Sequence, residues 1–99
     1  MIQGTTPTIA LHLPLPVSTV AEAEFVLADY NGAILRKWML SEMETDGTTL
    51  RIGLTQEETL QLDPTLHKCQ LRIKTTEGKV MATKVMSLSV SDLISEEVI

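Results

Sequence analysis

Two histidines and one cysteine are the residues of this chain best suited to metal binding or nucleophilic chemistry: His12, His67 and Cys69. Metal sites usually combine several such ligands at short spacings. His12 and His67 stand far apart, so a site would also need carboxylates from different loops. His67 and Cys69 would share one face of a strand, at a separation too long for the direct hydrogen bond of a Cys–His couple. We therefore predict no metal site and a buried or half-buried structural thiol.

Paired carboxylates occur at three places that could suggest acid–base catalysis or calcium binding: Glu42 with Glu44, Glu57 with Glu58, and Glu96 with Glu97. Glycosidase carboxylates face each other across a cleft, and calcium loops carry a dense Asp/Asn ligand pattern, which this spacing does not provide. The sequence also contains no P-loop, GxGxxG or GxSxG motif. We expect a protein that is not an enzyme, with no catalytic, cofactor-binding or metal-binding residues and no cofactor.

The charge balance argues against nucleic acid as a partner. The 99 residues carry a formal net charge of −5, the wrong sign for binding a phosphate backbone. No apolar run approaches the roughly 18 residues of a transmembrane helix, and the first residues lack the basic region of a signal peptide. A single cysteine cannot form an internal disulfide. These features predict a protein that is not secreted, not membrane-bound, and present in the cytoplasm when it folds.

The first strand is expected at residues 9–13, between two prolines. Apolar and other side chains alternate there, with Ile9, Leu11 and Leu13 on one face. Pro7 and Pro14 at its ends suit an edge strand. An edge strand without charges is open to pairing with other strands, so we expect a loop or a partner to cover it.

Three glycine turns divide most of the remaining chain into hairpins: Asn31-Gly32, Asp46-Gly47 and Glu77-Gly78. Asn-Gly between apolar runs predicts a type I′ turn, with positive φ at both residues. The paired arms are expected at residues 24–28 and 33–40, 43–45 and 48–54, and 68–76 and 79–90. Alternation in 33–40 is irregular, with Ile34, Arg36, Trp38 and Leu40 on one face, which indicates a bulge or an environment that is apolar on both sides. A phase change near Val85-Met86 predicts a second bulge.

A short helical turn is expected after residue 54. Thr55 and Glu58 have the spacing of a capping box, in which each side chain accepts a hydrogen bond from the other residue's backbone. About seven short strands with this turn in a crossover predict one all-β domain over residues 1–99, an immunoglobulin-like antiparallel β-sandwich.

Two regions are candidates for binding. One is an interface made of the first strand and the apolar residues of the tail: Ile9, Leu11, Leu13, Leu93, Ile94, Val98 and Ile99. The other is a ligand face that uses Tyr30 and Trp38, as in a small carbohydrate-binding or host-surface-binding module. A lone Trp in an apolar strand is more often a core residue.

Three segments carry a family resemblance: GTTPT (Gly4 to Thr8), LTQEETL (Leu54 to Leu60) and QLRIKTTEGKVMATKVMSLSV (Gln70 to Val90). Together with the acidic, apolar tail they resemble small uncharacterised proteins encoded by phages and prophages of Gram-positive bacteria. The resemblance implies a virion structural or assembly protein of the tail or baseplate, which contacts copies of itself or other phage structural proteins. It also implies a location in the virion, or in the bacterial cytoplasm during expression.

Overall fold

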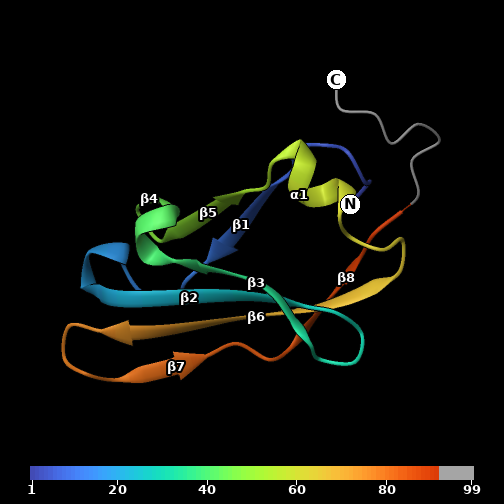
Figure 1. Cartoon of the computed structure of the whole chain (residues 1–99). Helices are drawn as coiled ribbons and strands as arrows, with labels where there is room; N and C mark the ends of the chain where they lie inside the picture. The colour runs from blue at the N-terminus through green and yellow to red at the C-terminus, as the bar shows by residue number, and fades with distance from the viewer. Residues whose placement is uncertain (92–99) are drawn as a thin grey trace.

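The computed structural model describes residues 1–91, whose strands form two antiparallel sheets on either side of one apolar layer (Figure 1). The three-stranded sheet has the order β1 (Thr8–His12), β5 (Thr49–Gly53), β4 (Glu44–Asp46). The five-stranded sheet has the order β3 (Ile34–Met39), β2 (Val20–Ala28), β6 (Leu66–Thr75), β7 (Val80–Ala82), with β8 (Met86–Ser89) also paired to β6. The helical segments are two 3-10 turns, Val17–Thr19 and Leu40–Glu42, and the helix α1 (Gln56–Leu60). The predicted all-β, antiparallel sandwich is thereby confirmed.

The three expected hairpins are present, and each has a glycine with positive φ in its turn: Gly32 (88°), Gly47 (59°) and Gly78 (89°). The predicted type I′ turn at Asn31-Gly32 is wrong, because no residue other than glycine has positive φ in residues 1–91. The loop is wider instead. Asp29 N–H donates to the Ala33 carbonyl at 2.9 Å, and Asp29 Oδ1 accepts from Ala33 N–H at 2.8 Å. The aspartate side chain satisfies the loop backbone, so only one residue needs the left-handed conformation.

The expected irregularity in β3 is a bulge. Arg36 pairs with Leu27, and Ile34 pairs with the next residue of β2, so Leu35 is the extra residue. The bulge reverses the side on which Ile34 lies. Ile34 therefore shares the solvent side of the sheet with Lys37 and Met39, and not the side of Arg36 and Trp38 as predicted.

The returning arm after Gly78 is split where the phase change was expected. β7 pairs with the second half of β6 and β8 with the first half, along the same edge. Residues 83–85 interrupt the arm, and Thr83 N–H still donates to the Leu71 carbonyl at 2.9 Å. The interruption leaves Val85 exposed beside the middle of β6.

The core is filled mainly by aliphatic side chains, as the scarcity of aromatic residues requires. Alternate residues of β2 and β6 point inward and are buried. Phe25 is completely buried at the centre of β2, and its ring centroid lies 5.9 Å from that of Trp38. Leu50 and Ile52 of β5 are also completely buried, from the opposite sheet.

α1 carries the chain from the three-stranded sheet to the five-stranded sheet, as predicted for the crossover. Its capping box is formed. Thr55 Oγ1 accepts from Glu58 N–H at 3.1 Å, and Glu58 Oε1 accepts from Thr55 N–H at 2.9 Å. Thr59 is buried and donates its hydroxyl to the Thr5 carbonyl at 2.8 Å. The short helix is therefore held by its cap and by one buried contact.

Replacing Thr55 by alanine is expected to lower the free energy of unfolding by about 1 kcal/mol, because a helix N-terminal donor loses its acceptor. Urea unfolding followed by the fluorescence of Trp38, the only tryptophan, measures this loss. Thr55→Ser is the control, since it keeps the hydroxyl oxygen and should stay within a few tenths of a kcal/mol of the native protein. Equal losses in both variants would mean that the cap contributes nothing.

Candidate functional site

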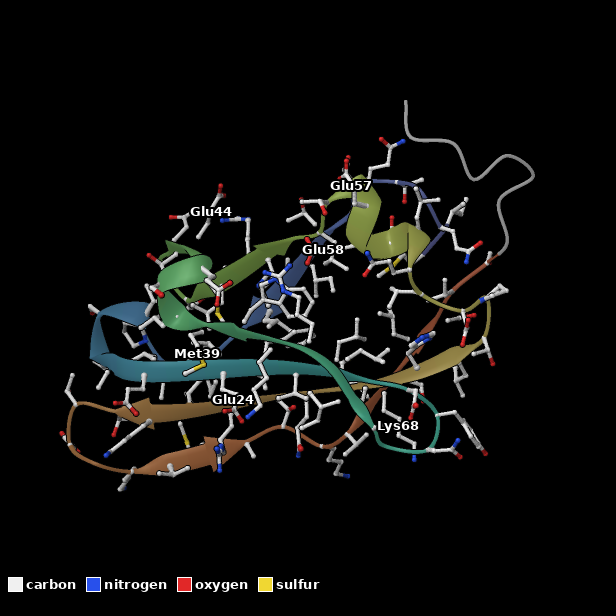
Figure 2. All side chains as sticks on the ribbon, viewed as in Figure 1. Glu24, Met39, Glu44, Glu57, Glu58 and Lys68 are labelled. Carbon is white, nitrogen blue, oxygen red and sulfur yellow. The ribbon has the colours of Figure 1, made fainter. Side chains whose placement is uncertain are left out.

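The solvent side of the five-stranded sheet is the candidate binding surface, because it exposes both large apolar side chains and a surplus of basic groups. We call it the outer face, and it consists of the outward-pointing side chains of β2, β3, β6 and β7 with Tyr30 and Val85. Figure 2 places Glu24, Met39 and Lys68 along this sheet, with Glu44, Glu57 and Glu58 near the opposite layer and α1. The outer face is formed because every second residue of β2 and β6 is used for the core.

Large apolar side chains are exposed on the outer face. They come from the β2–β3 turn and from four strands or their ends: Tyr30, Ile34, Met39, Leu66, Val80 and Val85. Ile34 and Val85 are both 59% exposed. In the described part of the chain, the outward positions of the three-stranded sheet have no large exposed apolar residue. Clustered apolar exposure of this kind is typical of an interaction surface.

Positive charge also gathers on the outer face, although the whole chain is acidic. Its outward positions on β2, β3 and β6 carry four basic residues, Lys37, Lys68, Arg72 and Lys74, and two acidic ones, Glu22 and Glu24. Glu24 lies between two of these cations, 3.2 Å from Arg72 and 3.8 Å from Lys37. One carboxylate thus serves two basic groups, and a positive surplus remains on the surface.

Lys68 is the cation best placed to meet a ligand. Its Nζ lies 5.4 Å from the centroid of the Tyr30 ring, and no carboxylate in residues 1–91 lies within ion-pair distance of it. The ring orients the ammonium without neutralising it. Lys68 is half-buried, so part of its hydration is already lost.

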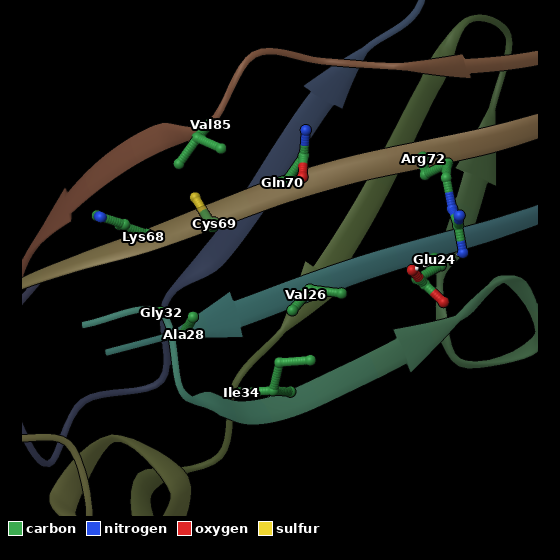
Figure 3. A pocket seen from close by; sticks show the side chains of 10 residues that line it. All are labelled: Glu24, Val26, Ala28, Gly32, Ile34, Lys68, Cys69, Gln70, Arg72 and Val85. Carbon is green, nitrogen blue, oxygen red and sulfur yellow. Dashed lines mark hydrogen bonds and ion pairs between the residues drawn. The ribbon is translucent and has the colours of Figure 1, made fainter. Parts of the chain in front are cut away.

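A hollow of about 380 Å³ lies in the middle of the outer face (Figure 3). Lys68 stands at one end, Arg72 and Glu24 at the other, and Val26 and Ile34 line the stretch between them. Two small residues explain the depression: Ala28, opposite Lys68 in the ladder, and Gly32 in the turn. The arrangement suits a ligand with an apolar part for the floor and a negative group for Lys68.

Cys69 also lines the hollow, although its side chain is buried against the core. Burial raises the pKa of its thiol, because the thiolate would lose hydration. The thiol is therefore protonated at neutral pH. It is the structural thiol that the sequence predicts.

The raised thiol pKa gives an expected pH dependence of stability. Above about pH 8.5 the thiol of the unfolded chain loses its proton, while the folded chain still holds it. The folded state then binds more protons than the unfolded state, so the free energy of unfolding decreases as pH rises from about 8 to 10. Urea midpoints of the native protein and Cys69→Ala measure the effect. The difference between them should change over this range, and a constant difference would contradict the assignment.

The predicted aromatic ligand face is not formed. Trp38 is only 2% exposed, packs against Phe25, and is covered by the Arg36 guanidinium 4.4 Å from its ring. Tyr30 is 60% exposed and lies on the outer face. The register of β3 explains the error, because Trp38 pairs with the buried Phe25 and so points inward. The alternative of a carbohydrate-binding or host-surface-binding module using both rings is therefore wrong.

The predicted interface residues fall into two groups. Leu11 is buried, and Ile9 and Leu13 are half-buried against the core, so these side chains contact the domain itself. The residues of the tail lie outside the described part of the chain: Leu93, Ile94, Val98 and Ile99. No second strand pairs with β1 beside β5 within residues 1–91, and the interface stays a prediction.

The two histidines lie on different sheets. His12, on β1, places Nδ1 3.2 Å from Thr49 Oγ1, and His67, buried on β6, places Nδ1 3.0 Å from the Thr65 carbonyl. Within residues 1–91, no three His, Cys, Asp or Glu side chains lie close enough together to hold a metal ion. None of the helices in this range is long and apolar enough to cross a membrane.

The outer face is the feature that the sequence analysis missed. Its signal is present in the alternation of residues 66–74, where Leu66, Lys68, Gln70, Arg72 and Lys74 stand between buried residues. Pattern alone shows that one side of this strand is polar. It does not show that neighbouring strands add exposed apolar residues to that side.

Comparison with known proteins gives a fold and no family. No family model and no curated protein matches the chain. Among solved structures the chain is similar to CopC from Methylosinus trichosporium OB3b, with a TM-score of 0.63, 12% sequence identity, and coverage of 92% of this chain and 82% of that one. This likeness supports the β-sandwich fold. It corrects the predicted function: the structure that the chain resembles is CopC and not a phage or prophage virion protein of the tail or baseplate.

Proposed function

We propose that this protein is a binding domain that holds an acidic, apolar segment of a partner protein on the outer face of its five-stranded sheet. The observation that supports the proposal most is the central hollow, in which the Lys68 ammonium, without an ion-pair partner in residues 1–91, stands beside an apolar floor. Val26 and Ile34 would contact apolar side chains of the segment, and Lys68 would meet a carboxylate.

The shape of the surface favours a chain segment over a small molecule. The hollow is open, and the exposed apolar residues continue past it toward Met39 and Val80 at the other end of the sheet. A small ligand would use the hollow alone. A segment of several residues would use the hollow and its apolar continuation together.

Charge favours an acidic partner. The outer face carries a surplus of basic groups on a chain of net charge −5, so a basic segment would be attracted elsewhere on the protein. Arg72 and Lys37 would extend the recognition beyond Lys68, since the single carboxylate of Glu24 lies between them.

Fluorescence anisotropy with dye-labelled peptides of about ten residues, long enough to cross the sheet, tests the proposal. A Glu-Glu-Leu-Leu repeat offers both chemistries, a Lys-Lys-Leu-Leu repeat reverses the charge, and a Glu-Glu-Ser-Ser repeat removes the apolar part. Only the first should bind well, and raising the salt from about 50 to 500 mM should weaken it. Equal binding of the acidic and basic repeats would contradict the proposal.

A further inference from the structure

Sheet edges carry unpaired backbone groups, and most edges of this protein are protected against pairing with another chain. Arg36 of the edge strand β3 points inward and forms ion pairs with Glu42 and Glu58. β4 has only three residues, of which the first and last are the acids Glu44 and Asp46. On the remaining edge of the five-stranded sheet, residues 83–85 separate β7 from β8.

Among the sheet edges of residues 1–91, β1 lacks such protection. It has five residues, no carboxylate, no lysine or arginine, and a regular ladder to β5. It pairs with no other strand in the described part of the chain. A charge-free, regular edge strand of this kind is a template for β-strand addition.

The ladder shows which backbone groups of β1 are free. Leu13 N–H donates to the Thr48 carbonyl at 2.7 Å, and Leu54 N–H donates to the Pro7 carbonyl at 3.0 Å. These bonds mark the odd-numbered residues as the ones that bond to β5, because alternate residues of an antiparallel strand bond to one neighbour. The N–H and C=O groups of Thr8, Ala10 and His12 therefore point toward the open edge.

We infer that β1 pairs with β1 of a second copy, antiparallel and centred on Ala10. In this register Ala10 faces Ala10 of the second copy, and Thr8 faces its His12. Each residue whose N–H and C=O groups point away from β5 then faces another such residue of the second copy. Each facing pair therefore exchanges two hydrogen bonds. The edge is complementary to itself, which is the requirement for a two-fold symmetric interface.

The side chains and charges around β1 are compatible with a second copy of the chain at this edge. On the inner side, Ile9 would lie opposite Leu11 of the second copy and extend the apolar layer, and on the outer side the small Ala10 leaves the symmetry axis free of bulk. The acids Glu44 and Asp46 are on the far edge of the same sheet, two strands away. Two chains of charge −5 can thus approach without bringing carboxylates of this sheet together.

Sedimentation equilibrium between about 10 µM and 1 mM tests the inference, since a small interface of this kind gives weak association. The native protein should form dimers within this range. Ala10→Pro removes an open N–H without touching the β5 ladder and should raise the dissociation constant at least about tenfold. Ala82→Pro is the matched control, because Ala82 is exposed on β7 and its N–H also points away from its ladder partner. The Ala82→Pro protein should dimerise as the native protein does.

A cross-link gives a second readout if Ala10→Pro fails to fold. Facing Ala10 residues of a hydrogen-bonded pair have Cα atoms about 5.5 Å apart, within disulfide range. Ala10→Cys should form a disulfide-linked dimer on mild oxidation, whereas Ala82→Cys and the native protein, whose Cys69 is buried, should not. A monomer at 1 mM, or the same association in Ala10→Pro, would overturn the inference. Peptide binding by the outer face is unaffected in Ala10→Pro, so failure of one proposal leaves the other standing.

Discussion

Replacing Lys68 by glutamate should weaken binding of the Glu-Glu-Leu-Leu peptide about tenfold. Exposed ion pairs contribute up to about 1 kcal/mol, and reversing the charge adds repulsion of similar size, so the sum is near the 1.4 kcal/mol of a tenfold change. Lys68 is half-buried beside the Tyr30 ring and has no carboxylate partner in residues 1–91. Its whole charge is therefore available to a ligand. Anisotropy titration at about 50 mM salt measures the change.

Two further variants distinguish the effect of the charge in the hollow on peptide binding from the effect of the protein's net charge. Lys79→Glu makes the same change of charge in the exposed turn after β6, outside the hollow, and should alter binding less than about twofold at moderate salt. Lys68→Met keeps the apolar stem and should fall between the native protein and Lys68→Glu. If Lys79→Glu weakens binding as much as Lys68→Glu does, recognition depends on total charge and not on the hollow.

Replacing Phe25 by alanine should lower the free energy of unfolding by about 3–5 kcal/mol. Phe25 is completely buried on β2 between β3 and β6, where its ladder partners are Trp38 and Leu71. Removing the ring leaves a cavity at the centre of the larger sheet and deletes the contact with Trp38. The cost is a large fraction of the 5–15 kcal/mol that stabilises a typical domain.

Urea unfolding followed by Trp38 fluorescence measures this loss, and the emission of Trp38 should shift to longer wavelength in Phe25→Ala as water reaches the ring. Phe25→Leu is the control, because it refills most of the volume and should cost less than about 1.5 kcal/mol. A loss below 1 kcal/mol in Phe25→Ala would show that the core is not organised around this ring.

The strands and turns of this fold could be predicted because each depends on local chemistry. The alternation of residues 9–13 predicted the buried side of β1, and the glycines predicted the three hairpin turns. The spacing of Thr55 and Glu58 predicted the start of α1. The turn at Asn31 was predicted with the wrong type because Asp29 supplies a side-chain acceptor, which a dipeptide rule does not consider.

The site could not be predicted because it depends on the register between paired strands, both within the β2–β3 hairpin and between β2 and the distant β6. The bulge at Leu35 moves Ile34 to the outer face, and pairing of β3 with β2 turns Trp38 toward Phe25. Neither outcome follows from the alternation of a single strand. The hollow further requires Ala28 of β2 to lie opposite Lys68 of the adjacent strand β6, which follows from the ladder between these two strands.

Mapping amide chemical shifts of the ¹⁵N-labelled protein during titration with the Glu-Glu-Leu-Leu peptide tests the binding of an acidic, apolar segment most directly. We expect the largest changes in the strands that form the hollow, at Val26, Ala28, Lys68 and Gln70 and in the turn at Gly32. The amides of β4 and β5, on the opposite sheet, should change little. Changes centred on β4 and β5, or no changes at millimolar peptide, would contradict the proposed function.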